Sequence, residues 1–329
     1  MDNNKLYPFL FEPNLHSVVW GGKRLNAWKH FPASEEPIGE SWEVSAVKSS
    51  INTISNGVLK GHDLVSVING NADAILGHKV AAEYGGELPL LVKFIDAQRD
   101  LSIQVHPGDE MAHRVHGKNG KTEMWYVIDA QPGSYLYAGF KQPIDREEYK
   151  RRIADGTICD VLAKHEVKAG DVFYIPSGRV HAICSGILLA EVQQSSDVTY
   201  RIFDYNRPGM DGKPRELHTE LAAEALDFRV ADNYRTEYAY TRNAANTIID
   251  SPFFKVRVLD TNRTMHCAMK SLDSFVIAMC LKGDCIIRTA TGDTPLREGF
   301  SALIPAAIAD YDIVPDNAEG YTKVLDAYV

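Results

Sequence analysis

Four side chains that can bind a metal ion fall in short segments of β-strand character: Gln104, His106, Glu123 and His181. Gln104 and His106 are two residues apart, so on a strand both project from the same face. Glu123 opens an aromatic and β-branched run, and His181 follows a second such run after a turn that contains Pro and Gly. Two imidazoles, one carboxylate and one amide oxygen suit a divalent ion of the zinc type, with room left for water or substrate. The pattern predicts a site for chemistry.

Short β-type runs, separated by Gly, Pro, Asn and Asp, must position these side chains. Such spacing is typical of a sandwich or barrel of antiparallel strands. The runs are Leu90–Ile95, Ser102–Val105, Trp125–Ile128, Ser134–Ala138, Val172–Ile175 and Ile187–Val192.

A few helices are expected between the strands. Asp145 is an N-cap candidate followed by acidic residues, and basic residues come later, before Gly156. Leu217–Leu226 is rich in Ala, Leu and Glu, which favour helix. Apolar spacings between Leu64 and Tyr84 indicate further short helices. The predicted fold is therefore mainly β with a few helices.

An internal repeat divides the chain. The spacing Gly170-x5-Pro176-x4-His181 recurs as Gly299-x5-Pro305-x4-Asp310, and the ten-residue spacing Glu123 to Gly133 recurs as Asp273 to Gly283. The second copy has an acid where the first has a histidine, and no counterpart of the Gln-x-His pair is evident. We therefore expect a duplicated β-barrel in which only the first copy binds a metal. The predicted domains are residues 1–235, which are catalytic and include the short helices, and residues 236–329.

Composition limits the partners and the compartment. The formal net charge of −9 argues against nucleic acid or an anionic membrane as partner, because both demand a basic face. No apolar run approaches the length of a membrane span, and the start lacks a secretory pattern. Five cysteines without a CxxC pair are expected to be reduced and mostly buried. These features predict a cytoplasmic protein; the oligomeric state is left open.

The same segments resemble the cupin superfamily. Residues 170–181 are similar to its second signature motif, and Gln104, His106 and Glu123 are similar to a variant of the first. That variant and its surroundings resemble the zinc-dependent mannose-6-phosphate isomerases in their short bacterial form, over most of the chain. The similar segments are Val19–Gly22, Gly39–Ser45, Pro89–Asp96, Leu101–Pro107, Lys121–Glu123 and Asp197–Arg201.

The resemblance implies two cupin-type antiparallel β-barrels (jelly rolls), the second degenerate, and interconversion of mannose 6-phosphate and fructose 6-phosphate. It implies that Gln104, His106, Glu123 and His181 bind one Zn²⁺ per chain in the N-terminal barrel. Arg201 matches the family's active-site arginine, and Lys121 and Asp197 match polar positions that line its pocket. Lys93 is also expected near the pocket, although a buried structural lysine fits it equally well. The C-terminal half carries less of the family pattern, so no phosphate-binding residue is assigned.

These residue types suit an isomerisation that passes through an enediol or enediolate. One carboxylate leaves the ion a net charge of about +1, so it can act as a Lewis acid. Arg201 adds a permanent cation that could stabilise the enediolate or bind phosphate. Lys121 would share a strand face with Glu123 and is one candidate base, while a metal-bound water is the rival. Asp197 could orient Arg201 or serve the ring-opening proton transfer.

Two other functions compete with an isomerase. A cupin could bind a sugar or sugar phosphate without turning it over, keeping the ligands for structure. An iron-dependent oxygenase on the same fold is the third possibility, but such enzymes usually present more imidazoles, and Gln104 replaces one here. His113 and His116 precede a probable loop and are expected to be solvated.

Overall fold

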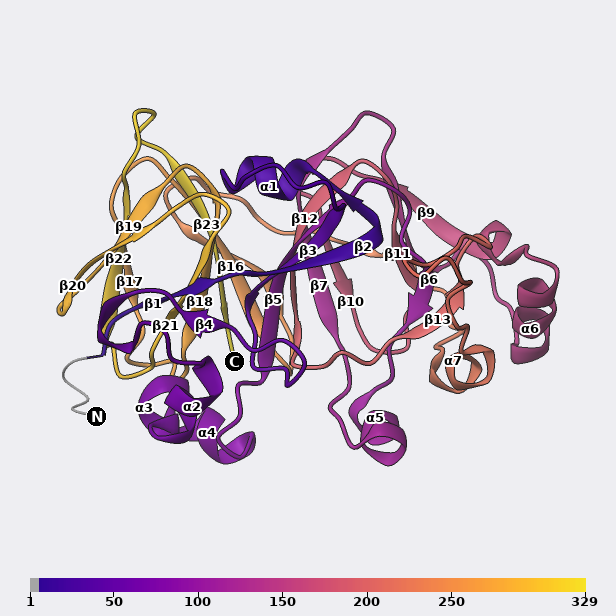
Figure 1. Cartoon of the computed structure of the whole chain (residues 1–329), viewed down its shortest axis with the longest axis horizontal. Helices are drawn as coiled ribbons and strands as arrows, with labels where there is room; N and C mark the ends of the chain where they lie inside the picture. Colours follow the sequence, from indigo (N-terminus) through magenta and orange to yellow (C-terminus); the bar gives the residue numbers. More distant parts are fainter. Residues whose placement is uncertain (1–5) are drawn as a thin grey trace.

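A computed structural model describes residues 6–329 of the chain, which form a mainly β protein (Figure 1). Its helices within that range are α1 (Arg24–Trp28), α2 (Leu64–Asn69), α3 (Ala72–Leu76), α4 (His78–Glu83), α5 (Asp109–His116), α6 (Arg146–Ala154) and α7 (Thr219–Ala225). The predicted fold class, mainly β with a few helices, is confirmed.

Two antiparallel sheets make up the right-hand part of Figure 1, and we call them the N-terminal sheet pair. The larger has the order β14 (Arg235–Thr236), β10 (Val172–Ile175), β7 (Glu123–Ala130), β12 (Ile187–Gln194), β5 (Leu90–Ala97), β3 (Ile38–Val44) and β2 (Asn14–Gly22). The smaller has the order β13 (Tyr200–Phe203), β6 (Ile103–Val105), β11 (His181–Ile183), β8 (Tyr135–Phe140) and β9 (Leu162–Glu166).

The C-terminal sheet pair lies on the left of Figure 1. Its larger sheet has the order β15 (Ala245–Asp250), β16 (Lys255–Thr261), β23 (Thr322–Tyr328), β18 (Val276–Lys282), β21 (Ser301–Ile304), β1 (Phe9–Glu12) and β4 (Thr53–Ile54). Its smaller sheet has the order β17 (Met265–Ala268), β22 (Asp310–Pro315), β19 (Cys285–Thr289) and β20 (Gly292–Leu296).

The sheets are open rather than closed barrels. Each hydrogen-bonded order in residues 6–329 ends on two edge strands, so no sheet of this range closes on itself. The two halves are also interlocked, because the early strands β1 and β4 extend the large C-terminal sheet. One buried apolar cluster contains residues of both large sheets and of α2–α4, including Phe9, Phe94, Met124 and Val256. The N-terminal segment thus ties the site-bearing half to the other half.

The expected helices are present and their ends follow the predicted signals. Asp145 caps α6 by accepting a hydrogen bond from the backbone of Glu148 at 2.7 Å, and Arg151 and Arg152 lie in the last turn. The short helices α2–α4 and α7 also match. Helix α5 was not anticipated, although its first turn is acidic and Gly117 ends it with a φ of 63°.

The predicted state of the cysteines is confirmed: all five are free, and all but Cys159 are buried. No helix among residues 6–329 has the length and apolar character that crossing a bilayer requires.

The two sheet pairs share a strand order, β10-β7-β12-β5 in the first and β21-β18-β23-β16 in the second. Their burial patterns differ at the position of the predicted repeat. His181 is buried and faces Gln104 across β11 and β6. Asp310, which the sequence spacing aligns with His181, faces Ala268 across β22 and β17 and is exposed, whereas the buried pair of those strands is Tyr311 and Cys267.

The second acid of the repeat was also misplaced. Ile175 faces Glu123, whereas Ile304 faces Val276 at the matching point of the other sheet. Asp273 lies in the preceding loop and accepts hydrogen bonds from the start of α4. Asp273 thus lies outside β18, and matched spacings in sequence do not report where the loop ends and the strand begins.

Candidate metal centre

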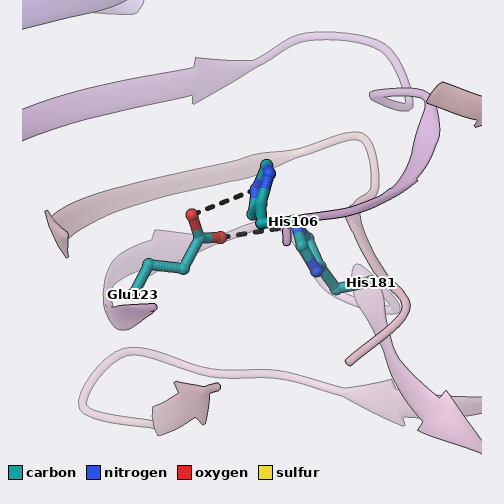
Figure 2. Close-up of side chains that lie close together, drawn as sticks. All are labelled: His106, Glu123 and His181. Atoms are coloured by element: carbon teal, nitrogen blue, oxygen red, sulfur yellow. Dashed lines mark ion pairs between the residues drawn. The ribbon is translucent and has the colours of Figure 1, made fainter. Parts of the chain in front are cut away.

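Three side chains meet at one buried point inside the N-terminal sheet pair. One ligand atom each from His106, Glu123 and His181 lies within 4.8 Å of the other two. Figure 2 shows both imidazoles turned toward the two oxygens of the carboxylate, and the shortest nitrogen–oxygen distances are 3.3 Å for His106 and 3.4 Å for His181. All three side chains are almost fully buried. Within residues 6–329 this is the one group of at least three His, Cys, Asp or Glu side chains with such geometry.

Backbone carbonyls fix the tautomer of both imidazoles. The Nδ1 atom of His106 donates to the carbonyl of Val198 at 2.9 Å, and Nδ1 of His181 donates to that of Arg179 at 2.8 Å. Each Nε2 therefore carries a lone pair that faces the other ligands. Burial lowers the pKa of His106 to about 3 and also lowers the pKa of His181, so both rings are neutral at pH 7.

Glu123 supplies a carboxylate without a hydrogen bond. Both of its oxygens are buried and accept no hydrogen bond from residues 6–329. Burial alone would raise its pKa, but the ammonium of Lys121 and the interactions with His106 and His181 together outweigh burial and hold the pKa of Glu123 well below its ordinary value. The Nζ atom of Lys121 lies 2.9 Å from a Glu123 oxygen and 3.0 Å from Nε2 of His106. A buried carboxylate that lacks a hydrogen bond is costly unless another partner, such as a cation, compensates it.

Gln104 reaches the same point from β6. Its amide nitrogen donates to Nε2 of His181 at 3.3 Å. Rotation of the amide by 180° exchanges its oxygen and nitrogen, and such a rotation turns the oxygen toward the three ligands. Two neutral imidazoles, a carboxylate and an amide thus fit a divalent metal ion of borderline character.

A second layer of buried charge lies next to these ligands, on the neighbouring strands of the large sheet. The Nζ atom of Lys93 lies 3.4 Å from a carboxylate oxygen of Glu40 and 3.4 Å from one of Glu191. Glu191 also accepts a hydrogen bond from the indole of Trp125 at 2.9 Å. Burial, followed by the charge of Glu123, raises the pKa of Glu191. Among Glu40, Glu123 and Glu191, only Glu191 has a pKa above its ordinary value.

Sequence reasoning did not identify Glu40 or Glu191, and it placed Lys93 near the pocket only through the resemblance. One signal was available. Lys93 and Glu191 each interrupt an apolar run of strand type, and a charged residue in the middle of a buried strand needs a partner. The two face each other across β5 and β12.

Arg201 lies on the same sheet face as Gln104, directly opposite it across β13 and β6. Its Nη1 donates to the carbonyl of Glu216 at 3.0 Å, and its Nε is buried with no hydrogen-bond partner among residues 6–329. Burial and then the nearby Arg215 lower the pKa of Arg201 from its high ordinary value. Residues 6–329 thus accept hydrogen bonds from only some of the N–H groups of this guanidinium.

Asp197 lies farther out. Its carboxylate pairs with Lys118 at 2.5 Å, and both residues line a surface cleft of about 610 Å³ between the loops at this end of the sheet. His113 and His116 are exposed on α5, as expected, although His116 is hydrogen-bonded to the hydroxyl of Tyr200. The structure therefore brings together the four predicted ligands and Lys121, with Arg201 on the same face, and pairs Asp197 with a surface lysine.

Known proteins carry the same sequence pattern and fold. The sequence model of the family "Phosphomannose isomerase type I, catalytic domain" matches residues 9–129. The mannose-6-phosphate isomerase of Streptococcus mutans is 33% identical over 310 residues, which are 94% of this chain and 96% of that protein. The mannose-6-phosphate isomerase ManA of Bacillus subtilis is 31% identical over 98% of this chain and 99% of its own length.

A solved structure agrees over the whole chain. The crystal structure of the mannose 6-phosphate isomerase from Bacillus subtilis superposes with a TM-score of 0.87 at 30% identity, covering 98% of this chain and 100% of that one. Because the superposition covers nearly all of both chains, the similarity extends beyond the candidate metal site to both sheet pairs. This chain belongs to the mannose-6-phosphate isomerase family.

Proposed function

We propose that this chain is a metal-dependent aldose–ketose isomerase that interconverts mannose 6-phosphate and fructose 6-phosphate. One observation carries the proposal: in a chain of this family, two imidazoles that turn Nε2 inward and one buried carboxylate place a ligand atom each within 4.8 Å of one another at a single buried point.

The ion proposed for this site is Zn²⁺, held by Gln104, His106, Glu123 and His181. The donor set of two imidazoles, one carboxylate and one amide oxygen supports this choice, since Zn²⁺ favours nitrogen donors and few ligands. When bound, the ion supplies a positive charge that stabilises the negative charge developing on the substrate oxygens.

Lys121 is the proposed base. In the direction from aldose to ketose, the proton on C2 must leave and a proton must arrive at C1. The Nζ atom of Lys121 lies beside Glu123 and His106, within the site, and can make both transfers. Solvent deuterium should therefore enter the sugar at the transferred position, and Lys121→Gln should abolish that incorporation while the metal is retained.

Glu191 is proposed to move the second proton, which passes between the oxygens on C1 and C2. The raised pKa of Glu191 and its place beside Lys93 support this role, because a carboxyl whose pKa is shifted upward keeps a proton more readily and can pass it on. Lys93 holds Glu191 in place across the sheet.

Arg201 is proposed to bind the phosphate or the enediolate. Its unpartnered Nε and its place opposite Gln104 support a role toward substrate. Asp197 is proposed to act at the rim of the site, through its pair with Lys118, in the ring-opening step or in the ordering of the adjacent loop.

The architecture and the location complete the proposal. The shared strand order supports a duplicated cupin-type jelly roll whose second copy has lost the ligands, with a domain boundary near residue 235. Five free cysteines support a reducing compartment, the cytoplasm.

The test is an isomerase assay with mannose 6-phosphate and a panel of other aldose phosphates, with metal content measured in parallel. We expect formation of fructose 6-phosphate, its loss after chelation, and its return with Zn²⁺. Tight binding of mannose 6-phosphate without product, in protein with full metal content, would instead identify a sugar-phosphate binding protein.

A further inference from the structure

The chain leaves β13 after Phe203, turns, and returns beside that strand. The backbone nitrogen of Arg201 donates to Nδ1 of His218 at 3.1 Å, and the backbone nitrogen of His218 donates to the carbonyl of Arg201 at 2.7 Å. The returning segment is therefore antiparallel to β13, and this pairing brings Asp204 opposite Arg215.

Asp204 joins the two ends of the segment 204–215 by binding Arg207 and Arg215 at the same time. Arg215 donates to both carboxylate oxygens, at 2.7 and 2.6 Å, and Arg207 donates to one of them through two nitrogens, at 3.0 and 2.8 Å. Asp204 is only 4% exposed. Charge-assisted bonds of this fork geometry are among the stronger and more directional contacts in proteins.

The turn that follows Asp204 has an unfavourable backbone conformation that the ion pairs of Asp204 can stabilise. Tyr205 and Asn206 have φ values of 55° and 53°, and the nitrogen of Arg207 donates to the carbonyl of Asp204 at 3.2 Å. Two consecutive positive φ values belong to a turn of type I′, which normally carries Asn-Gly. A tyrosine is disfavoured in the left-handed region, so contacts outside the turn must hold it.

The returning segment also provides a hydrogen-bond acceptor that orients the side chain of Arg201. Glu216, which directly follows Arg215, provides the carbonyl that Nη1 of Arg201 contacts at 3.0 Å. No acidic side chain is paired with Arg201 among residues 6–329, and its Nε has no partner. The direction of this guanidinium therefore depends on where the carbonyl of Glu216 is held.

We propose that Asp204 is a positioning residue for Arg201: by clamping Arg207 and Arg215 it closes the returning segment and fixes the carbonyl that orients the Arg201 guanidinium. This inference rests on the proposed function in that Arg201 serves the isomerisation. It adds a residue that contacts neither the metal ligands nor Arg201 directly.

The experiment compares Asp204→Asn with the wild-type holoenzyme. We expect kcat/KM to fall about 10- to 100-fold, as when a catalytic group is misplaced by a fraction of a bond length or more, with metal content unchanged. Asp204→Glu should recover part of the loss. The matched control is Asp293→Asn, which removes an exposed acid that binds Arg288 through two nitrogens in the C-terminal sheet pair, and should leave activity unchanged.

A double mutant separates positioning from general damage. In an Arg201→Ala background, Asp204→Asn should cause no further loss of kcat/KM, because the group that it positions is gone. A loss as large as in the wild-type background would overturn the proposal, as would wild-type activity in Asp204→Asn.

Limited proteolysis tests the clamp without relying on activity. Arg207 and Lys213 precede prolines and resist trypsin, so Arg215 provides the cleavable bond of the segment. Asp204→Asn should be cut there faster than wild type and Asp293→Asn should not; equal cutting would reject the clamp. If Asp204→Asn does not fold, Arg215→Lys keeps the charge and the cleavage site but loses the fork, and the same result is expected. Absence of isomerase activity in the wild type would refute the proposed function, and proteolysis would still decide whether Asp204 holds the segment.

Discussion

The N-terminal and C-terminal sheet pairs place different chemistry on the same strand order. On corresponding strands the first has a proposed metal ligand where the second buries an apolar or aromatic side chain. Gln104, Glu123 and His181 lie on β6, β7 and β11, and the buried Cys267, Val276 and Tyr311 lie on β17, β18 and β22. A few side chains, not the scaffold, therefore decide which half holds the metal site.

The smaller sheets differ by one strand. The N-terminal order begins with β13 outside β6, whereas the C-terminal order begins with β17, the counterpart of β6. The additional strand carries Arg201. The half that bears the proposed ligands thus has a cation on the adjacent strand, and within residues 6–329 the other half lacks the corresponding strand.

Buried charge alone does not distinguish the halves. Lys93 faces Glu191 across β5 and β12, and Arg257 faces Asp326 across β16 and β23. In the C-terminal pair, Asp326 also accepts from the hydroxyl of Tyr311. An ion pair at this register therefore belongs to both halves, and only in the first does it adjoin metal-binding side chains.

The largest difference between the two halves is expected when His181 in the first and Tyr311 in the second are each replaced. His181→Ala should reduce the metal content well below one ion per chain and lower kcat by roughly 10³-fold, because charge stabilisation of several kcal/mol is lost. Tyr311→Phe should keep both metal and activity. It should lower only the free energy of unfolding, by about 1–2 kcal/mol, for the hydrogen bond to Asp326.

Metal analysis, steady-state kinetics and thermal unfolding on both variants make this comparison. Full metal content and turnover in His181→Ala would mean that the ion is bound elsewhere in the molecule. Loss of metal in Tyr311→Phe would show that the two sites are not independent.

The next largest effect is expected from β13, the strand that within residues 6–329 is present only in the N-terminal sheet pair. Arg201→Ala should leave metal content intact and lower kcat/KM by about 10²- to 10³-fold, the effect typical of losing one preorganised charge in an active site. The side chain contacts none of the ligands, so the metal should not respond. Near-normal turnover would refute the role of Arg201.

The paired charges provide a third test. Glu191→Gln removes the proposed proton carrier and should lower kcat about 10- to 100-fold with little change in metal content. Asp326→Asn leaves Arg257 buried without a charged partner, so it should lower the free energy of unfolding by roughly 1–3 kcal/mol and leave kcat unchanged. Kinetics and denaturant unfolding on the two variants distinguish a catalytic pair from a structural one, and a kcat defect in Asp326→Asn would reject this distinction.

Much of this site could be read from the sequence because its ligands lie in short, strongly patterned strands. Alternation on β6 put Gln104 and His106 on one face, and the turn before His181 marked the start of β11. The strand Val172–Ile175 and the helix that Asp145 caps were also predicted close to their observed bounds. Local periodicity carried this information.

The rest depended on pairing between distant strands, which local patterns do not encode. Glu191 became significant only when β12 was seen to lie between β5 and β7. The repeat aligned the exposed Asp310 with the buried His181 because spacing does not report which face a strand turns inward. The joining of β1 and β4 to the C-terminal sheet is likewise a long-range pairing. Asp197 was judged by its distance in sequence from Arg201, whereas its carboxylate turns to Lys118.

The smallest difference is expected between Gln104 and Cys267, which lie on the corresponding strands β6 and β17 of the two halves. If the amide oxygen of Gln104 is a fourth ligand, Gln104→Ala should weaken metal binding about 10- to 100-fold, as loss of an outlying or supporting ligand does, and leave protein loaded at saturating metal with most of its activity. Cys267→Ala should not change metal affinity, and should lower the free energy of unfolding by about 1 kcal/mol through lost packing. Competition with a chelator of known affinity measures both. Unchanged affinity in Gln104→Ala would reduce the centre to the three ligands His106, Glu123 and His181, and would assign Gln104 to orienting His181, whose Nε2 it already contacts.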